Sequence, residues 1–597
     1  MTRRHGLRLL WLIVILLLQG CAVSRENVRR ADQLIAANRS HRLDCARADH
    51  CATPSALRAL GQDGHNQAVI LEQGRDALIA RLSLIRAATR SIDIQTYIWA
   101  DDDAGKLVLD ELVRAARRGV RVRILADQLG SFNDVEQLAR LARTHVNFEL
   151  RLYNPTLHEA ETGAFGYIAG GLCCFDRFNQ RMHNKLLLID AVVGITGGRN
   201  YENKYFDWDE AFDFRDRDVV VGGPVAAEMA ASFHTFWVHP RAVPLARLRD
   251  VNQRLREDGA AAPGWQTPRY AQGARVEFVL GAALDPEYIR QHFLAHVFTL
   301  GEVAYFSDLP GKRKHPGDAK VRELTDHLMH LVANTRRELV LQTPYLVISK
   351  PAQRIFRRLR AERPEVDILI STNSLASTDA FAVYALSHKY KRRYLAAFGF
   401  TIYEFKPHPA EAERLIADFA QLSGIGGEQG SKHRRDKVPL NTKGVRVSIH
   451  AKSMVVDGEF AMIGSHNFDP RSDDYNTEAG IIVNDQAFAA ALRASILADT
   501  RPGNAWVIAR RQTEDVLSRI NRVFAKLSEK LPIFDLWPIR YATSFELKPG
   551  CQPIRPGQPG FYECYRPVGE FPEVALPMKS IYTRIITAFG AGISGVL

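Results

Sequence analysis

Two stretches of this chain carry the same pattern: Arg181-Met182-His183-Asn184-Lys185-Leu186-Leu187-Leu188-Ile189-Asp190 and Ile449-His450-Ala451-Lys452-Ser453-Met454-Val455-Val456-Asp457. Each continues to two small residues and an asparagine, as Gly197-Gly198-Arg199-Asn200 and as Gly464-Ser465-His466-Asn467. Both copies fit H-x-K-x4-D-x6-G-[GS]-x-N without a gap. A single H-x-K-x4-D arises by chance in roughly one chain of this size in twenty, so the duplication makes the pattern informative.

Leu186-Leu187-Leu188-Ile189 in one copy and Met454-Val455-Val456 in the other are apolar and partly β-branched, which predicts a short buried strand in both copies. Side chains two positions apart on a strand point to the same face, so the imidazole and the ammonium of each H-x-K should emerge side by side. The candidate catalytic residues are therefore His183, Lys185 and Asn200 in the first copy, and His450, Lys452 and Asn467 in the second.

The duplication extends beyond the motifs. Residues 91–99 and 121–126 read as strands on either side of a helix, and the same order recurs with strands at 339–343 and 367–371 around a helix at 353–363. Strands that alternate with helices predict an α/β fold with two pseudo-symmetric halves, each a mostly parallel sheet flanked by helices. Since each half contributes one motif, we expect the active site at their interface.

We divide the chain into six segments from these patterns and from the composition between them. They are a signal peptide at 1–20, a lipidated tether at 21–64, a first domain at 65–245, a linker at 246–274, a second domain at 275–500 and a C-terminal extension at 501–597. The linker contains an Ala/Gly/Pro-rich stretch, which is typical of a connection between domains. The sequence does not reveal the task of the extension.

Cleavage of a phosphodiester needs a nucleophile, an acid for the leaving group and compensation for the charge on the phosphoryl oxygens. Neutral imidazole is a nucleophile near pH 7 and protonated imidazole is an acid there, so two histidines can divide these roles. Two lysines and two asparagines then form an electrostatic clamp. The duplicated motif therefore predicts phosphodiester chemistry that uses neither a metal ion nor a cofactor.

Acidic and small residues complete the predicted site. Asp218 and Glu478 follow the two motifs and open apolar strands, so we expect these carboxylates to orient the histidines. Asp190 and Asp457 belong to the motifs, and we expect them to brace the motifs through hydrogen bonds. The small residues Gly197, Gly198, Gly464 and Ser465 are expected to let backbone N–H groups approach a phosphate.

These segments resemble the paired motifs of the phospholipase D superfamily, and their surroundings resemble the bacterial cardiolipin synthases, most closely the C type. The segments that carry the resemblance are 181–185, 197–206, 373–379, 467–472 and 476–478, and the likeness covers about residues 65–500. It implies two phospholipase D-like domains, a phosphohistidine intermediate and transfer of a phosphatidyl group to an alcohol. It also implies that His183 is the nucleophile and His450 the acid and base, although the near symmetry of the halves leaves the reverse assignment open.

The leading hypothesis is a phosphatidyltransferase that forms cardiolipin from phosphatidylglycerol and a second phospholipid, with phosphatidylethanolamine as one candidate. A hydrolytic phospholipase D, which would use water and release phosphatidic acid, stays open because no residue separates the two outcomes. An exported nuclease of the same superfamily is disfavoured, since nucleic acid is scarce outside the cytoplasm. A non-enzymatic lipoprotein is disfavoured because both motifs are complete.

The N-terminus predicts export to the bacterial cell envelope. Three arginines precede an apolar run at 9–18, which is too short to span a bilayer and is typical of a signal peptide. The run ends in Leu18-Gln19-Gly20-Cys21, which resembles a lipobox in which Cys21 is lipidated. An uncleaved anchor or an ordinary signal peptide is the alternative. By analogy with lipoprotein sorting, Ala22 favours the outer membrane over the inner, facing the periplasm.

Composition and cysteine count fit such an exported protein. The 597 residues are 46% hydrophobic and 24% charged, which is ordinary for a globular chain, and the net charge of +12 suits an anionic partner. Six cysteines remain after Cys21, and their spacing suggests Cys45–Cys51 and Cys551–Cys564 disulfides, with Cys173 and Cys174 either bridged or reduced. We expect a monomer that binds phospholipid and a membrane, and the need for an accessory protein stays open.

Overall fold

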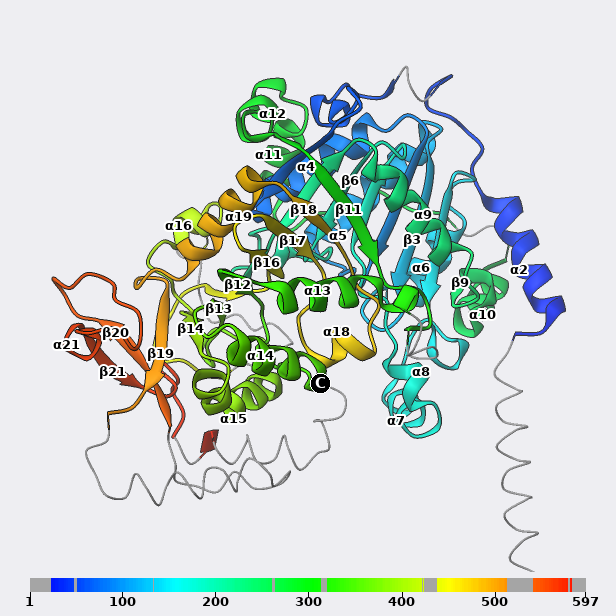
Figure 1. Cartoon of the computed structure of the whole chain (residues 1–597). Helices are drawn as coiled ribbons and strands as arrows, with labels where there is room; N and C mark the ends of the chain where they lie inside the picture. The colour runs from blue at the N-terminus through cyan, green and yellow to red at the C-terminus, as the bar shows by residue number, and fades with distance from the viewer. Residues whose placement is uncertain are drawn as a thin grey trace, which may run out of the picture.

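The protein is a mixed α/β molecule of two halves, each built on one large sheet with helices against it (Figure 1). The computed structural model describes residues 23–47, 51–132, 134–259, 263–312, 319–420, 422, 438–512, 541–577 and 580–581. The α/β class with two pseudo-symmetric halves, expected from the repeated strand and helix pattern, is confirmed. Residues 1–22, which include the expected signal peptide and Cys21, lie outside the described residues.

The first half contains nine strands that form one sheet in the order β10-β1-β8-β6-β5-β2-β3-β4-β9. Their bounds are β1 Asn66–Leu71, β2 Ser91–Thr96, β3 Arg121–Asp127, β4 Phe148–Tyr153, β5 Leu186–Ile189, β6 Val193–Gly197, β8 Asp218–Gly222, β9 Ala242–Pro244 and β10 Phe298–Leu300. Its main helices are α4 Gly74–Ala87, α5 Asp103–Arg117, α6 Val135–Ala142 and α9 Val225–Trp237. Two further helices, α7 Ala164–Cys173 and α8 Phe175–Asn179, precede the first motif.

The second half repeats this order in a ten-stranded sheet, β11-β18-β17-β16-β12-β13-β14-β19-β20-β21. Its strands are β11 Glu302–Ser307, β12 Glu338–Gln342, β13 Asp367–Asn373, β14 Phe400–Phe405, β16 Ser453–Val456, β17 Phe460–Gly464, β18 Ala479–Asn484, β19 Ala505–Arg510, β20 Ala542–Leu547 and β21 Tyr565–Gly569. Its helices include α13 Glu323–Asn334, α14 Lys350–Glu362, α15 Phe381–Ala396, α18 Pro470–Asp474 and α19 Gln486–Asp499. The centre β8-β6-β5-β2-β3-β4 corresponds to β18-β17-β16-β12-β13-β14.

The expectation of mostly parallel sheets was wrong. Only the neighbours β2-β3-β4 and β12-β13-β14 run parallel, and all other neighbours within the two large sheets run antiparallel. The sequence pattern caught the strand-helix-strand units that make the parallel part. It missed the hairpins β5-β6 and β16-β17, which form because the chain reverses directly after each motif strand.

The segments around the two halves are more structured than the sequence indicated. Helix α2 (Arg25–Asn38), in the stretch expected to be a tether, packs against helix α10 (Arg249–Asp258), which lies in the expected linker. Strand β10 still pairs with β1, so the first sheet extends past that linker. Strands β19 to β21 extend the second sheet into the C-terminal extension.

Three disulfides occur in the described chain: Cys45–Cys51, Cys173–Cys174 and Cys551–Cys564. The first and third are the pairs that the cysteine spacing suggested. The third closes the loop between β20 and β21 at the edge of the second sheet. Among the described residues, the helices are too short or too polar to cross a membrane.

A shared apolar core joins the two halves. Helices α9 and α19 lie between the sheets, and each contacts a strand of the other half, β11 and β10 respectively. Phe233 and Phe236 of α9 and Phe488 and Leu492 of α19 are fully buried in one cluster with strand residues of both sheets. Burial of such apolar area is the main favourable term in association of two layers, so the halves should unfold together.

We expect Phe233→Ala to lower the free energy of unfolding by about 3–5 kcal/mol, because it removes a fully buried ring from this shared core. The matched control is Phe278→Ala, whose ring is 49% exposed and should change stability by less than about 0.5 kcal/mol. Chemical denaturation followed by circular dichroism measures both. Equal effects of the two substitutions would contradict a core shared by the halves.

Candidate active site

Both histidines sit where a motif strand begins, and each is held by backbone pairing with the opposite half. His183 N donates to Thr477 O at 2.9 Å, and Thr477 N donates to Arg181 O at 3.0 Å. On the other side, β15 (Arg446–Ile449) pairs in parallel with β7 (Phe212–Arg215), and His450 N donates to Arg215 O at 2.8 Å. The two motifs are therefore placed by an exchange of short strands across the interface.

Each imidazole takes its carboxylate partner from the other half as well. His183 Nδ1 lies 2.8 Å from Glu478 Oε2, and His450 Nδ1 lies 2.6 Å from Asp216 Oδ2. Both carboxylates are fully buried, and each histidine is 7% exposed. A carboxylate on Nδ1 fixes the tautomer with its proton on Nδ1, which leaves Nε2 of each ring free to react.

The expected pairing of Asp218 with a histidine was wrong, because Asp216 occupies that place. Asp218 instead accepts from Arg81 Nη2 at 2.8 Å and from the backbone N–H of Arg199 at 3.2 Å. The register explains the error, since Gly197 faces Asp218 and Gly464 faces Gly480 in the two sheets. Glu478 stands two residues before Gly480, and the residue two before Asp218 is Asp216.

The expected backbone cradle for phosphate is also not as predicted. The N–H groups of Gly198, Gly464 and Ser465 donate to Arg217 O, Lys452 O and Ala479 O within the sheets. Small residues are needed here for another reason: a Cβ on Gly198 would lie 2.1 Å from Asp216 Oδ1, and one on Gly197 would lie 2.3 Å from Asp218 Oδ1. Ser465 Oγ donates to Glu478 Oε2 at 2.5 Å. These positions make room for the carboxylates and hold one of them.

The lysines and asparagines of the motifs gather around the histidines. Lys185 Nζ donates to His183 O at 2.8 Å, and Lys452 Nζ lies 3.0 Å from His450 Nε2. Asn200 Nδ2 donates to Tyr205 Oη at 2.9 Å. Asn467 Oδ1 is buried and has no hydrogen-bond partner within the described part of the chain, so this oxygen is available to accept a hydrogen bond.

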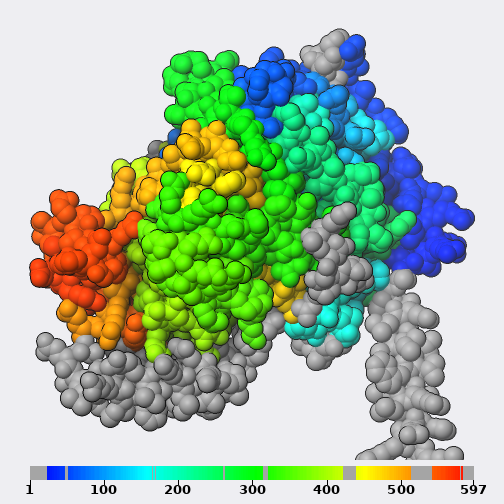
Figure 2. Space-filling view, viewed as in Figure 1, coloured from blue at the N-terminus to red at the C-terminus, as the bar shows by residue number. Residues whose placement is uncertain are grey.

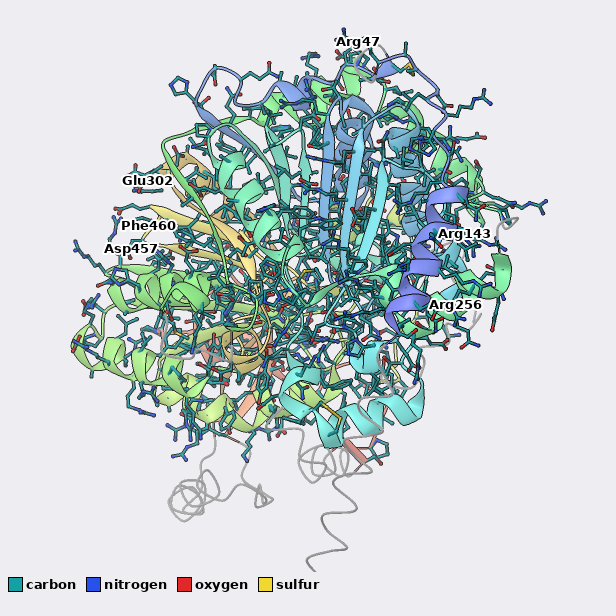
Figure 3. All side chains as sticks on the ribbon, turned by 90° about the vertical axis from the view of Figure 1, so that its right-hand side faces the viewer. Arg47, Arg143, Arg256, Glu302, Asp457 and Phe460 are labelled. Carbon is teal, nitrogen blue, oxygen red and sulfur yellow. A yellow bond between two sulfur atoms is a disulfide. The ribbon has the colours of Figure 1, made fainter. Side chains whose placement is uncertain are left out.

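Asp190 and Asp457 lie at the other end of the motif strands and brace the backbone. Asp190 accepts from the N–H groups of Thr89, Arg90 and Ser91, and from the Arg58 guanidinium. Asp457 accepts in the same way from residues 336–338. Figure 3 places Asp457 beside Phe460 at the edge of the molecule, where β16 turns into β17. This geometry agrees with a structural task for both aspartates.

Several further residues support the motifs, and the sequence pattern did not predict this role for them. Asp127, at the end of β3, accepts from Met182 N at 2.9 Å, and Asn373, at the end of β13, accepts from Ile449 N at 2.8 Å. Each therefore holds the residue directly before a histidine. Asp308 accepts from Glu478 N at 3.1 Å and from Lys312 Nζ at 2.7 Å. Asp127 and Asn373 occupy equivalent positions in the two halves, because they end β3 and β13, the second of the three parallel strands in each sheet. This equivalence was the sequence signal that could have identified them.

Burial and neighbouring charges shift the ionisation of the whole cluster. Burial lowers the pKa of His183 to about 4 and that of His450 to about 3, so both imidazoles are neutral at pH 7 in this state. Burial opposes ionisation of Glu478 and Asp216, but electrostatic interaction and a hydrogen bond with His183 and His450, respectively, together with the charge of the motif lysines, outweigh it and hold both carboxyl pKa values below the usual range.

The lysines are shifted for the same reason. Burial lowers the pKa of Lys185 to about 7 and that of Lys452 to about 8, although Glu478 and Asp216 act in the opposite direction. Lys185 feels the charges of Lys452 and Asp216, and Lys452 those of Glu478 and Asp216, so the two motifs form one electrostatic unit. An anion bound between them would raise all four pKa values by its negative charge.

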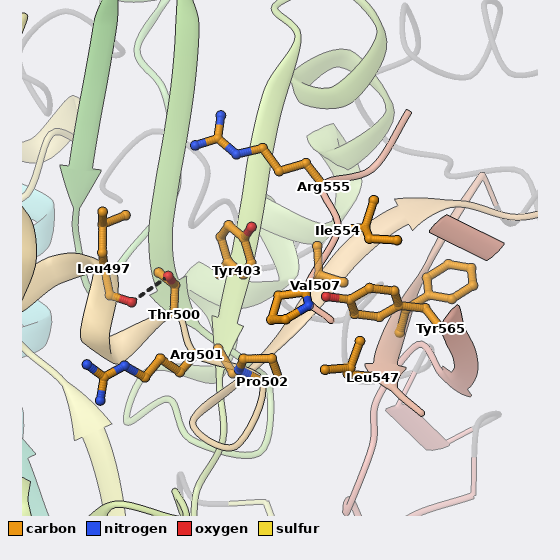
Figure 4. Close-up of a pocket in the computed structure, with 13 residues that line it drawn as sticks. Tyr403, Leu497, Thr500, Arg501, Pro502, Val507, Leu547, Ile554, Arg555 and Tyr565 are labelled. Atoms are coloured by element: carbon orange, nitrogen blue, oxygen red, sulfur yellow. Dashed lines mark hydrogen bonds between the residues drawn. The ribbon is translucent and has the colours of Figure 1, made fainter. Parts of the chain in front are cut away.

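Other features of the described chain do not contribute to this centre. A cavity of about 250 Å³ lies between β14, β19 and the loop after β20, and Figure 4 shows Tyr403, Arg501 and Tyr565 among the side chains around it. Its lining contains none of the motif residues. Within the described residues, no group of three or more His, Cys, Asp or Glu side chains is arranged to hold a metal ion.

Comparison with known proteins agrees with a site built from two half-motifs. A family profile described as "Cardiolipin synthase, PLD-like domain" matches residues 82–237 and 328–499, one segment in each half. Cardiolipin synthase C of Escherichia coli (strain K12) is 31% identical over 429 residues, which are 70% of this chain and 81% of that protein. The chain belongs to the phospholipase D-like family of cardiolipin synthases.

Other relatives extend this comparison. An "Uncharacterized protein" of Helicobacter pylori (strain J99 / ATCC 700824) is 31% identical over 434 residues, covering 72% of this chain and 79% of its own length. Cardiolipin synthase B of Escherichia coli (strain K12) is 22% identical over 433 residues, with the same two coverages. The solved structure of phosphatidylserine synthase from Haemophilus influenzae Rd KW20 has a TM-score of 0.46 at 15% identity, covering 80% of this chain and 97% of that one.

The exchange of carboxylates predicts different effects for two neighbouring aspartates. We expect Asp216→Asn to reduce turnover by about 10²–10⁴-fold, because His450 loses the group that fixes its tautomer. Asp218→Asn should leave turnover per folded molecule within about tenfold of the wild type, since Asp218 contacts Arg81 and Arg199 and not a histidine. The same substitution should lower the free energy of unfolding by about 3–5 kcal/mol, because it leaves the buried arginines without their partner. Turnover and denaturation of both variants test this, and the reverse ranking of the two turnover losses would contradict the assignment.

The lowered lysine pKa values predict a pH-dependent affinity for a phosphate mimic. Sulfate keeps a constant charge, so its affinity should fall by at least about tenfold between pH 6 and pH 9, as Lys185 and Lys452 lose their protons. Calorimetry in buffers of different ionisation enthalpy should show proton uptake on binding. A Lys185→Arg/Lys452→Arg variant should bind with a weaker pH dependence than the wild type, because guanidinium stays charged. Equal wild-type affinity at both pH values would contradict the shifts.

Proposed function

We propose that the protein is a phosphatidyltransferase that forms cardiolipin from phosphatidylglycerol and a second phospholipid through a phosphohistidine intermediate. The observation that carries the proposal is the pair of buried histidines, each with a carboxylate from the opposite half on Nδ1. Such a pair supplies one neutral nucleophile and one acid at a single phosphate. The family of the chain and its relatives named cardiolipin synthase support the substrate class.

In the first step, Nε2 of His183 attacks the phosphorus of the donor lipid while the bond from phosphorus to the headgroup oxygen breaks. His450 gives a proton from its own Nε2 to that oxygen, and the free headgroup alcohol leaves. His450 must hold that proton, and the charge of the bound phosphodiester favours the protonated ring over the neutral ring of the empty site. Lys185 and Lys452 stabilise the charge on the phosphoryl oxygens.

In the second step, neutral His450 takes the proton from a hydroxyl of the acceptor. The acceptor oxygen attacks phosphorus, the bond from phosphorus to Nε2 of His183 breaks, and the enzyme is restored. If the acceptor is phosphatidylglycerol, the product is cardiolipin; if it is water, the product is phosphatidic acid. The choice of His183 as nucleophile follows the family resemblance, because the two histidine pairs are nearly equivalent in geometry.

We place this reaction at a bacterial membrane facing the periplasm, with the outer membrane favoured, through a lipidated Cys21. The support is the sequence before Cys21 and the disulfide pairs, which form in oxidising compartments. Substitution of Cys21 by Ala should release the protein from the membrane fraction or leave it as an uncleaved precursor. Mature lipoprotein in that variant would contradict the anchor.

The reaction is tested by mass spectrometry of lipids after incubation of purified full-length protein with vesicles of phosphatidylglycerol and phosphatidylethanolamine. We expect cardiolipin with the wild type and a loss of at least about 10³-fold in His183→Ala and in His450→Ala, because each removes a reacting group. The control is His330→Ala on α13, whose ring is exposed and away from the site.

The products separate the hypotheses. The released headgroup identifies the donor, glycerol for phosphatidylglycerol and ethanolamine for phosphatidylethanolamine. Phosphatidic acid without cardiolipin would make the protein a hydrolase. Unchanged lipids, or full activity in either histidine variant, would contradict the proposed chemistry.

A further inference from the structure

We propose that the protein docks on an anionic lipid surface through one face formed by the α7–α8 protrusion and the exposed side of helix α14. The inference rests on the proposed function, because a phosphatidyltransferase must take its substrates from a bilayer. It adds which face meets the lipid. We call this surface the docking face and define it by Tyr167, Phe175, Lys350, Arg354, Arg357 and Arg358.

The apolar part of the docking face is the α7–α8 protrusion. Among the α-helices of ten or more residues in the described chain, α7 alone carries no charged side chain. Tyr167 of α7 is 45% exposed and Phe175 of α8 is 41% exposed, within nine residues of each other. Exposed aromatic rings on a short apolar helix are typical of segments that enter the interfacial region of a membrane.

The basic part is the outer side of α14. Lys350, Arg354, Arg357 and Arg358 are exposed, while Gln353, Phe356 and Leu359 face the core, so the helix is amphipathic with a basic outer stripe. Basic residues near an anionic surface contribute about 1 kcal/mol each, which means that such a stripe strengthens docking severalfold per residue. The sign of the stripe, and the net charge of +12, match anionic phospholipid.

Both parts lie at the same end of the molecule. Figures 1 and 3 place α7 and α8 at the lower end of the molecule. In Figures 1 and 2, the green region that contains α14 and α15 lies beside them in the lower part of the second half. A hydrogen bond from Arg471 Nη2 of α18 to Asn179 O links α8 to the second half, at 3.4 Å. The docking face therefore spans both halves.

The same end adjoins the histidine pair. Helix α8 ends at Asn179, four residues before His183, and α18 begins three residues after Asn467. The loop that leads from β12 to α14 contacts the second motif, because Thr343 Oγ1 donates to Asn467 O at 2.6 Å. A lipid surface at this end would present headgroups directly to the motifs, so the orientation serves the reaction.

A second pair of exposed apolar side chains offers a matched alternative. Phe278 of helix α11 (Gly273–Ala282) is 49% exposed and Leu284, which follows this helix, is 45% exposed. Helix α11 lies at the opposite end of the molecule in Figure 1. That end also exposes Glu277, Asp285 and Glu287, whose charges an anionic surface repels. It therefore serves as the control face.

The test is hydrogen–deuterium exchange of the full-length protein with vesicles of phosphatidylcholine, with or without phosphatidylglycerol. We expect amides of α7, α8 and α14 to become protected when phosphatidylglycerol is present, while those of α11 stay unchanged. The readout is local, so an anchor at the N-terminus does not imitate it. Protection of α11, or of none of these helices, would overturn the proposal.

Variants then connect docking to turnover. Tyr167→Ser/Phe175→Ser and Arg354→Glu/Arg357→Glu should each reduce turnover on vesicles by about tenfold or more, and change turnover of detergent-dispersed substrate by less than about twofold. Phe278→Ser/Leu284→Ser should change neither. An equal loss on both substrate forms would mean damage to the site and would overturn the docking assignment.

Two further comparisons separate this proposal from the proposed function. His183→Ala should give the same exchange protection as the wild type, because docking does not need catalysis. Protection at the docking face without any lipid turnover in the wild type would refute the proposed function and leave the docking face standing. Cardiolipin formation without protection there would refute the docking face alone.

Discussion

The reciprocal exchange of carboxylates across the interface is the interaction on which the site depends. Glu478 reaches His183 and Asp216 reaches His450, so neither imidazole is oriented by its own half. The exchange requires the short pairings of Met182 with Thr477 and of β15 with β7, which bring each carboxylate to its ring. Arg217 strengthens the same junction, since its guanidinium donates to Gln342 and Ser453 of the second half. Packing of α9 and α19 between the sheets joins the two halves beside this junction.

Burial is what makes the cluster chemically useful. In water, imidazole, lysine and carboxylate would have separate and ordinary pKa values, and the lysines would be charged at any physiological pH. Enclosed together, neutral histidines stand beside ionised carboxylates and lysines whose pKa values lie near neutrality. Such a site is electrostatically incomplete without an anion, and a phosphodiester supplies the missing negative charge. Binding and activation are therefore the same event, because the charge that holds the substrate also protonates the acid.

The sequence was sufficient for the parts of the site that are local in the chain. The two motifs and Glu478 could be predicted, because spacing along one strand decides which side chains share a face. Asp216 could not be distinguished from Asp218 in this way, since the choice depends on which residue faces Gly197 in the neighbouring strand. The strand directions failed for the same reason, as hairpins β5-β6 and β16-β17 are set by tertiary pairing. Asp127 and Asn373 contact the motifs from strands more than fifty residues away, so no spacing within a motif marks them, and only their equivalent positions in the two halves do.

The crossed arrangement also constrains how such a chain can evolve. In a duplicated protein with two self-sufficient sites, one copy is free to accumulate changes while the other preserves activity. Here the duplication produced a single centre, and a change at Asp216 in the first half acts on His450 in the second. The effect of a change in one half therefore depends on the residue in the other half. The outer helices can diverge independently, but the crossed pairs must be inherited together. The two carboxylate positions hold Glu478 in one half and Asp216 in the other, so the crossed pairs are equivalent in role without being identical in residue.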